Sequence, residues 1–465
     1  MQTGRCGLFP NFPIVCGVSI TDWEEESVAT GGDLNACADF MNVLSERDPH
    51  RRQSGTRIAW IGDAGGDGGV PKLCALFLQE LLGLGVEIDW FTTTTDEFEW
   101  ACHPNLRRFA SPYEWEWNSW YGRNARMAFI ASFLKRIRAN QELACRVVAE
   151  HRRKPYDAVI QFSQGELLAL RPFAHELPIL LYPQVHAAGE LRWCQIEEPL
   201  ARKCEPWWWR RFRLLYLRYR SRLQRRDYGL ARGILGVSQH FNDLIAADYL
   251  LPASKFGVVY HPMAAMEEPQ KSYREDGEVR LLFVGRISVR KGIEVLIEAI
   301  PQLLAEDDRL SVALVGSGAL WSNYEPLMEA LPTLRCEWRK SAPNREIIEE
   351  MGRSDVLLMP SSYEPGGIVV TEALASGMIL AASEEVGAAE GLEPPIRWTY
   401  PARDVGAFKA AVHAAAQAVR QHRGELRQMA RRCASDRFGG RAVAEKLLAE
   451  AERLLGRTAG TRATL

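Results

Sequence analysis

Two glutamates, Glu364 and Glu372, stand eight positions apart and give the clearest chemical signal in the sequence. They follow an apolar run, Val356 to Met359, that is typical of a buried strand. The small residues after them predict a helix that begins near Ile368. One carboxylate is therefore expected in the loop and the other in the second turn of the helix.

Gly366 and Gly367 lie between the two glutamates and leave the backbone open to a ligand. The free amides at the start of the following helix can bind an anion. A ligand with hydroxyls at both ends and a diphosphate between them fits this order, and a nucleotide sugar is such a ligand. The other interpretation is a pair of acidic residues that only favour the helix start.

A basic loop precedes this segment in the chain. The predicted strand Arg280 to Val284 is followed by Arg286 and Lys291, and then by an amphipathic helix, Ile293 to Leu304. Two fixed cations can neutralise the charge that grows on a departing diphosphate. Arg286 can bind it through two hydrogen bonds and Lys291 as a point charge, whereas Arg290 is interpreted as solvated. A plain solvated turn is the alternative.

Two further glycine turns follow predicted strands. Gly316 and Gly318 come after the strand Ser311 to Val315. Gly68 and Gly69 belong to a glycine-rich loop between the strand Arg57 to Ile61 and a helix, Leu73 to Leu84. Such turns can bring the backbone close to phosphates. In other proteins they only reverse the direction of the chain.

His186 follows the apolar strand Pro178 to Tyr182. It is thus expected at the carboxyl end of a strand, where open α/β sheets bind their ligands. A single histidine is more often a hydrogen-bonded structural residue, and both interpretations stay open.

The segment from Glu364 to Glu372 resembles the Glu-x7-Glu signature of the retaining family 4 glycosyltransferases, the glycosyl transferases group 1, which have the GT-B fold. The resemblance implies that Glu364 contacts the donor sugar and Glu372 the ribose. It also implies roles for the other residues: Gly366 and Gly367 along the phosphates, Arg286 and Lys291 at the diphosphate, Gly316 and Gly318 near the nucleotide, Gly68 and Gly69 over the diphosphate, and His186 at the transferring sugar.

The sequence departs from the family at two places. The family has a bulkier residue at the position of Gly366, and an Asn-Gly pair where this chain has His261 and Pro262. The first departure concerns the shape of the sugar pocket. The second is interpreted as a difference in hinge geometry.

The resemblance implies transfer of a sugar from a nucleotide diphosphate to an acceptor hydroxyl with retention of configuration. In this front-face mechanism the leaving phosphate helps to deprotonate the acceptor, and neither a metal nor a cofactor is needed. The alternatives are another GT-B enzyme, such as a nucleotide-sugar epimerase or a sugar phosphorylase, and a non-catalytic protein that binds a nucleotide sugar at a membrane. No motif for the pyridoxal lysine of a phosphorylase is present.

Predicted strands alternate with helices along the chain, which indicates parallel sheets covered on both faces. The expected fold is α/β: two Rossmann-like, doubly wound parallel-sheet domains that face a central cleft. The expected parts are an N-terminal extension of unknown role (1–55), an acceptor-side domain (56–265), a donor domain (266–440) and a C-terminal helix that packs back on the first domain (441–465). A polar link, 262–276, separates the halves.

Composition excludes several classes of protein. The chain has 465 residues and a net charge of −2, so no general attraction to nucleic acid is expected. Its ten cysteines show no Cys-x2-Cys spacing, which speaks against a zinc site or a disulfide scaffold. No apolar run reaches the length of about 18 to 20 residues that a spanning helix needs. A cytoplasmic protein is expected.

Residues 207–226 predict a basic, aromatic helix with eight arginines. One face of a helical wheel carries apolar and aromatic residues: Trp208, Phe212, Leu215, Tyr219 and Leu223. The opposite face carries four of the arginines: Arg211, Arg218, Arg222 and Arg225. Such a helix could lie on an anionic membrane, at its inner face, and bring the enzyme to a lipid-linked acceptor. The alternative is a surface helix whose apolar face is buried in the first domain.

Overall fold

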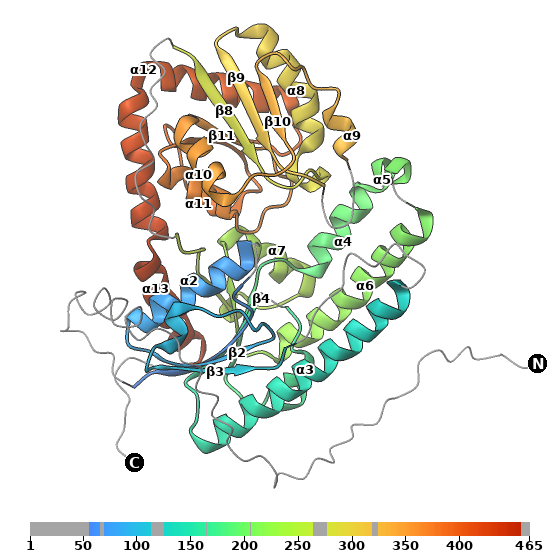
Figure 1. Cartoon of the computed structure of the whole chain (residues 1–465), viewed down its shortest axis with the longest axis vertical. Helices are drawn as coiled ribbons and strands as arrows, with labels where there is room; N and C mark the ends of the chain where they lie inside the picture. Colours follow the sequence, from blue (N-terminus) through green and yellow to red (C-terminus); the bar gives the residue numbers. More distant parts are fainter. Residues whose placement is uncertain are drawn as a thin grey trace, which may run out of the picture.

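The computed structural model describes residues 55–65, 69–112, 125–163, 165–204, 206–263, 277–318 and 324–456. They form two α/β domains, the first in blue to green and the second above it in yellow to red (Figure 1). Three predicted features lie outside the described residues: Gly68, nearly all of the N-terminal extension, and most of the link between the domains.

The first domain is built on a seven-stranded sheet in the order β3-β2-β1-β4-β5-β6-β7, and all of its pairs are parallel. Its strands are β1 (Arg57–Ile61), β2 (Glu87–Thr92), β3 (Leu106–Ala110), β4 (Ala158–Ser163), β5 (Ile179–Pro183), β6 (Gly233–Gly236) and β7 (Phe256–Val258). The central strands are apolar runs that are buried on both faces, as a helix-covered parallel sheet requires.

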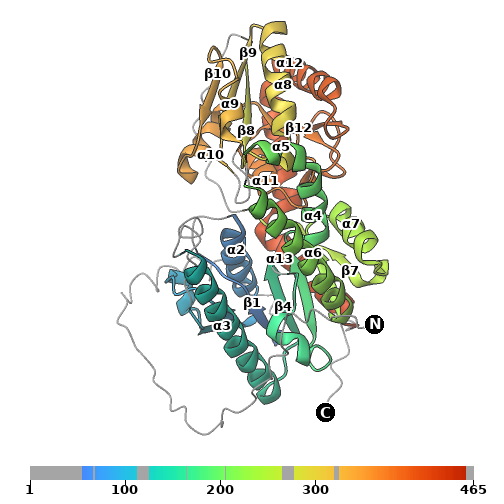
Figure 2. The same ribbon diagram turned by 90° about the vertical axis from the view of Figure 1, so that its right-hand side faces the viewer.

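Helices cover both faces of this sheet. They are α2 (Gly69–Gly83), α3 (Ala125–Arg153), α4 (Ala187–Ile196), α5 (Glu198–Cys204), α6 (Trp207–Leu230) and α7 (Gln239–Tyr249). Aromatic rings of Trp60, Phe77, Phe162 and Tyr182 meet at centroid distances of 5.3 to 6.0 Å and bind α2 to the sheet. α5 reaches up to the second domain (Figure 2), where Leu200 packs against its core.

The second domain repeats the plan with a six-stranded parallel sheet in the order β10-β9-β8-β11-β12-β13. Its strands are β8 (Val279–Val284), β9 (Leu310–Val315), β10 (Cys336–Arg339), β11 (Val356–Met359), β12 (Ile379–Ser383) and β13 (Arg397–Tyr400). Its helices are α8 (Ile293–Glu306), α9 (Glu325–Met328), α10 (Asn344–Arg353), α11 (Ile368–Ala375) and α12 (Val405–Phe438).

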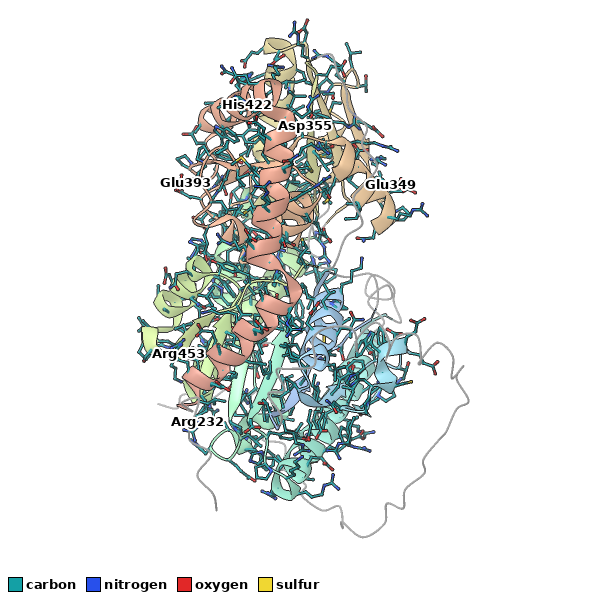
Figure 3. The ribbon with its side chains drawn as sticks, turned by 90° about the vertical axis from the view of Figure 1, so that its left-hand side faces the viewer. Arg232, Glu349, Asp355, Glu393, His422 and Arg453 are labelled. Atoms are coloured by element: carbon teal, nitrogen blue, oxygen red, sulfur yellow. The ribbon has the colours of Figure 1, made fainter. Side chains whose placement is uncertain are left out.

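The chain returns to the first domain at its end. The long helix α12 runs along the second domain and continues into α13 (Gly440–Leu454), which lies on the first (Figure 3). α13 packs against α2, β6 and β7, and Arg453 donates a hydrogen bond of 2.6 Å to the carbonyl oxygen of Phe256. The two domains are thus joined by the link after β7 and again by this helix pair.

The expectation of two doubly wound parallel sheets is confirmed. In each sheet the strand order reverses at one point, between β1 and β4 and between β8 and β11. Ligands of such sheets bind beyond the carboxyl ends of the strands at this point. The loops that follow β8 and β11 carry the basic residues and the first glutamate, so the topology brings the two predicted loops together.

Candidate functional site

Lys291 and Glu364 form an ion pair at the carboxyl edge of the second sheet. Lys291 ends a 3-10 turn, Val289–Lys291, after β8, and Glu364 lies in the turn after β11. Their side chains are 16% and 12% exposed. Two residues that are 73 positions apart in the sequence therefore share one partly buried site.

The electrostatics of this pair favour an anion nearby. Burial opposes ionisation of Glu364, but Lys291 and Arg290 outweigh it and hold the pKa of this carboxyl below its usual value. Burial lowers the pKa of Lys291, and Glu364 opposes that shift while Arg290 and Arg286 add to it. Two cations, Lys291 and Arg290, thus act on one carboxylate. Arg290 is half-buried and Arg286 exposed, so the interpretation of Arg290 as the solvated cation is wrong.

Glycines allow the two loops to touch. Gly292 has a φ of +78°, and a Cβ atom there would lie 2.0 Å from the carbonyl oxygen of Pro360. Gly367 has a φ of +101° and stands directly before α11. Both positions therefore need glycine, the first for close approach and the second for its left-handed backbone.

The turn that carries Glu364 is held by backbone hydrogen bonds. The amides of Gly387 and Ala388 donate to the carbonyl oxygens of Glu364 and Gly366 at 2.9 and 2.7 Å. From the first domain, the Ser238 hydroxyl donates to the carbonyl oxygen of Pro365 at 2.7 Å. The turn is therefore fixed from both domains.

Glu372 lies on α11 and is half-buried. Burial raises its pKa to about 7, although the charge of Lys72 on α2 opposes the shift. Gly69 at the start of α2 approaches Ile368 at the start of α11, because a Cβ on Gly69 would lie 2.8 Å from its Cδ1. The N-termini of two helices from different domains thus meet beside Glu372.

The glycine turn after β9 borders the basic loop. A Cβ on Gly316 would lie 1.8 Å from the carbonyl oxygen of Gly285. The amide of Ile287 donates to Ser317 at 2.8 Å, and Gly318 bridges to Ile287. Trp338 donates from its indole nitrogen to the carbonyl oxygen of Gly316 at 3.0 Å.

His186 is completely buried and links three elements. Its Nδ1 lies 2.8 Å from the Tyr363 hydroxyl, and its Nε2 lies 2.7 Å from Oδ2 of Asp248 on α7. The ring therefore fixes the residue next to Glu364 from the first domain. Its predicted contact with a transferring sugar stays a prediction.

A set of contacts that we call the interdomain latch joins α7 to the second domain. Glu390 accepts hydrogen bonds from the amides of Gln239 and His240, at 2.8 and 2.9 Å, and from the Tyr260 hydroxyl at 2.7 Å. The His240 ring lies 3.0 Å from Glu385. A carboxylate of one domain thus caps a helix of the other.

Sequence reasoning missed two residues of the site, His261 and Lys72. His261 was interpreted only as part of the hinge, but its ring lies against Gly366 and its Nε2 is 2.5 Å from Oε1 of Gln184. Nothing in the sequence places either residue near the glutamates, because both contacts depend on how the domains meet.

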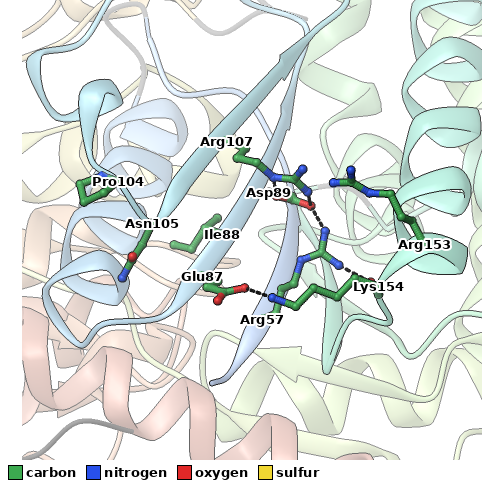
Figure 4. Close-up of a pocket in the computed structure, with 9 residues that line it drawn as sticks. All are labelled: Arg57, Glu87, Ile88, Asp89, Pro104, Asn105, Arg107, Arg153 and Lys154. Carbon is green, nitrogen blue, oxygen red and sulfur yellow. Dashed lines mark hydrogen bonds and ion pairs between the residues drawn. The ribbon is translucent and has the colours of Figure 1, made fainter. Parts of the chain in front are cut away.

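A separate pocket lies at the amino ends of the strands of the first sheet, beside the first residues of β1 and β2 (Figure 4). Ion pairs fill it: Arg57 and Arg107 bind Asp89, and Lys154 binds Glu87. The charged residues that line it are thus held in ion pairs, including that of Arg153 with Glu150, which is typical of a structural network. Nowhere in the described chain do three His, Cys, Asp or Glu residues gather so that they could hold a metal.

Comparisons with known proteins bear on the fold and on the second domain. Residues 265–431 match the model of the family glycosyl transferases group 1, and they include the basic loop and both glutamates. An uncharacterised glycosyltransferase of Methanocaldococcus jannaschii is 30% identical over 183 residues, which are 36% of this chain and 47% of that protein. The chain thus spans about half the length of that relative.

Two solved structures resemble the whole architecture. Sucrose-phosphate synthase from Thermosynechococcus elongatus has a TM-score of 0.58 at 17% identity, over 86% of this chain and all of that one. HepE from Anabaena, in complex with UDP-glucose, has a TM-score of 0.54 at 15% identity, over 85% of this chain and 99% of that one. Together with the two sheets, these likenesses define the fold as GT-B. The second domain is related to the group 1 glycosyltransferases.

Proposed function

We propose that the protein is a retaining glycosyltransferase that transfers a sugar from a nucleotide diphosphate to an acceptor hydroxyl. The observation that carries the proposal is the pairing of Lys291 with Glu364, inside the segment that matches the family. The buried glutamate has its charge balanced by a cation that a diphosphate would also attract. HepE binds UDP-glucose, which supports a nucleotide sugar as the donor.

In the proposed reaction the acceptor hydroxyl attacks the anomeric carbon on the face from which the diphosphate leaves. The bond from the anomeric carbon to the diphosphate oxygen breaks, and the departing phosphate takes the proton of the acceptor. Arg286 and Lys291 stabilise the charge on the leaving group, Glu364 orients the sugar and Glu372 holds the ribose. The reaction then needs neither a metal nor a cofactor beyond the donor.

The glycines and His186 complete the proposed donor site. Gly366, Gly367, Gly316 and Gly318 bring the backbone close to the nucleotide and its phosphates, and Gly69 closes the site from α2. Because His186 anchors Tyr363, it can act on the sugar through the position of Glu364 as well as by direct contact.

The test begins with thermal shift of the full chain against UDP-, ADP- and GDP-sugars, since a ligand of the folded state raises the melting temperature. Hydrolysis of the donor that binds is then measured. We expect Glu372→Ala to weaken donor binding, Lys291→Ala to lower turnover more than affinity, and Glu364→Ala to do both. Arg345→Ala serves as the control, because Arg345 is 91% exposed on the same domain. If no nucleotide sugar binds, or if all three variants hydrolyse the donor normally, the proposal is wrong.

The surface of α6 supports a membrane as a partner. Its apolar residues Trp207, Leu215 and Tyr219 are 69%, 55% and 59% exposed, and Trp208 and Phe212 are exposed as well. The basic side chains are exposed as well: Arg211, Arg218, Arg222 and Arg225. The apolar and the basic residues are therefore both in solvent, and the apolar face is not buried in the domain. The helix docks instead through another side, which includes Trp209, Arg213 and Leu217.

We therefore propose that α6 lies on an anionic lipid surface, at the inner face of a membrane. None of the described helices has the length and apolarity to cross a bilayer. Flotation with neutral vesicles and with vesicles containing anionic lipid tests this contact. We expect binding to anionic vesicles only, and its loss in Leu215→Ser with Tyr219→Ser. Leu334→Ser, at a leucine that is 76% exposed elsewhere, should bind normally. Absence of binding by the unaltered chain would refute the contact.

A further inference from the structure

The ring of His261 fills the space beside Gly366. A Cβ on residue 366 would lie 2.2 Å from Cε1 and 2.8 Å from Nδ1 of this histidine. Gly366 is not among the described glycines with a positive φ, unlike Gly367. The missing side chain at 366 is therefore required by space and not by backbone conformation. A residue of the interdomain connection thus takes the place of a side chain in the glutamate turn.

The hydrogen bonds of His261 define its tautomer. The Gln184 amide nitrogen lies 3.4 Å from the carbonyl oxygen of Tyr182, so its Oε1 faces the histidine. That oxygen accepts from Nε2 of His261 at 2.5 Å, which places the ring proton on Nε2. Burial lowers the pKa of His261 to about 4, against the opposing charge of Glu364. The ring is therefore neutral near pH 7, and Nδ1 carries a lone pair.

Nδ1 of His261 has no hydrogen-bond partner among the described residues, although the residue is only 6% exposed. Buried acceptors are normally paired, and an unpaired one costs free energy until a partner arrives. The nearby charged group is Glu364, which acts on the ring electrostatically and can itself only accept when ionised. Nδ1 therefore calls for a hydroxyl donor from a ligand, and Glu364, which accepts from Lys291 through one oxygen, can accept a second hydroxyl through the other.

We propose that His261 is a specificity-determining residue of the donor site, and that its Nδ1 accepts a hydrogen bond from a hydroxyl of the donor sugar held by Glu364. The inference rests on the proposed function. Two neighbouring sugar hydroxyls supply one donor to each acceptor, so the site selects a sugar with such a pair free. Residue 366 is glycine because the His261 ring, which contacts the sugar, occupies the space that a side chain would need there.

Two substitutions of His261 distinguish the roles of the two ring nitrogens. The amide of Asn reaches the place of Nδ1, and the amide of Gln reaches the place of Nε2. His261→Gln therefore keeps the bond to Gln184 and loses the acceptor, whereas His261→Asn keeps the acceptor. The probes are UDP, ADP and GDP and the corresponding nucleotide-glucoses, with affinity measured by calorimetry on the full chain.

We expect His261→Gln to weaken binding of the nucleotide-glucose about three- to ten-fold, the effect of one lost hydrogen bond, and His261→Asn to weaken it less than about two-fold. Affinity for the nucleotide alone should not change. His261→Phe keeps a ring but has no acceptor, so it should lose affinity as His261→Gln does. If His261→Gln does not fold, His261→Phe takes its place in the test.

The outcomes separate this inference from the proposed function. If the unaltered chain binds none of the probes, the proposed function is wrong. If it binds but both loss variants keep full affinity for the nucleotide-glucose, only the inference is overturned. A loss of equal size for the nucleotide alone would also overturn it, because His261 would then be a structural residue.

Discussion

Glu372 is the acidic residue of the site whose charge changes near neutral pH. Burial raises its pKa to about 7, with Lys72 opposing the shift. An ionised carboxylate accepts the hydrogen bonds of a ribose more strongly than a neutral one. We therefore expect the affinity for a nucleotide-glucose to rise with pH from about 6 to 8, one unit either side of this pKa. Calorimetry across this range measures it.

Glu372→Gln should bind about ten-fold more weakly at the upper end of that range and show no slope, because its amide does not titrate. The probe itself contributes no slope, since a diphosphate esterified at both ends lacks the second phosphate pKa near 6. An equal slope in Glu372→Gln would assign the titration to another group.

Gly366 offers a second prediction for single residues. Gly366→Ala places a methyl group 2.2 Å from Cε1 of His261, and such overpacking costs roughly 1 to 3 kcal/mol of unfolding free energy. In the double variant with His261→Ala the clash is gone, so the two effects should not add. Urea denaturation measures both.

Gly424→Ala is the matched control for this cycle. Gly424 lies in α12 just after the kink at His422, with nothing within 4 Å of an added Cβ, so alanine there should stabilise by at most about 0.5 to 1 kcal/mol. Strictly additive effects of the Gly366 and His261 substitutions would contradict the contact between them.

The residues that the sequence could identify are those whose position follows from a strand end. Lys291 and Glu364 each follow a buried strand of one sheet, so a strand pattern and a motif suffice to bring them together. His261 and Lys72 could not be found in this way. Their contacts cross the domain boundary, and neither motif nor periodicity describes how two domains meet.

At the scale of elements, two strands at sheet edges, β3 and β13, were not predicted. β3 and β13 each contain arginine, and each mixes buried residues with partly and fully exposed ones. Such strands lack the continuous apolar run that marks a central strand. The helix α2 begins at Gly69, four residues before its expected start, because its first turn carries a glycine and a proline.

The helix α13 should stabilise a domain that precedes it by hundreds of residues. Leu447 is completely buried among residues of the first-domain core. Leu447→Ala should lower the free energy of unfolding by about 2 to 5 kcal/mol, through lost burial and a cavity. Glu445→Ala, on the exposed side, removes only a surface pair with Arg441 and should cost less than about 1 kcal/mol. Equal, small effects would show that α13 does not dock.

At the scale of the whole molecule, the two domains meet around the glutamate turn and not only through their covalent connections. His186 bonds Tyr363, Ser238 bonds Pro365, and the interdomain latch surrounds Glu390. α7 is thus fixed to the second domain although it belongs to the first sheet. The contacts that hold the turn of Glu364 thus also join the two domains.

His240 makes the interdomain latch sensitive to pH. Its hydrogen bond to Glu385 raises the pKa of His240 above its ordinary value of 6.5, against burial and with help from Glu390 and Asp243. The protonated ring is therefore more favourable in the folded chain than in the unfolded one. Its contribution to stability is complete below pH 6.5 and is lost as the pH rises through the higher folded pKa.

We expect the free energy of unfolding to fall more steeply with rising pH, above about 6.5, in the unaltered chain than in His240→Gln. Glutamine can still donate to Glu385 but does not titrate, so the difference between the two curves isolates the histidine. Glu372, whose pKa is raised in the folded chain, also lowers the free energy of unfolding as the pH rises. This effect is the same in both chains and cancels in the difference between their curves. Chemical denaturation at a series of pH values measures the curves. Parallel curves would mean that the pair of His240 and Glu385 does not hold the domains together in solution.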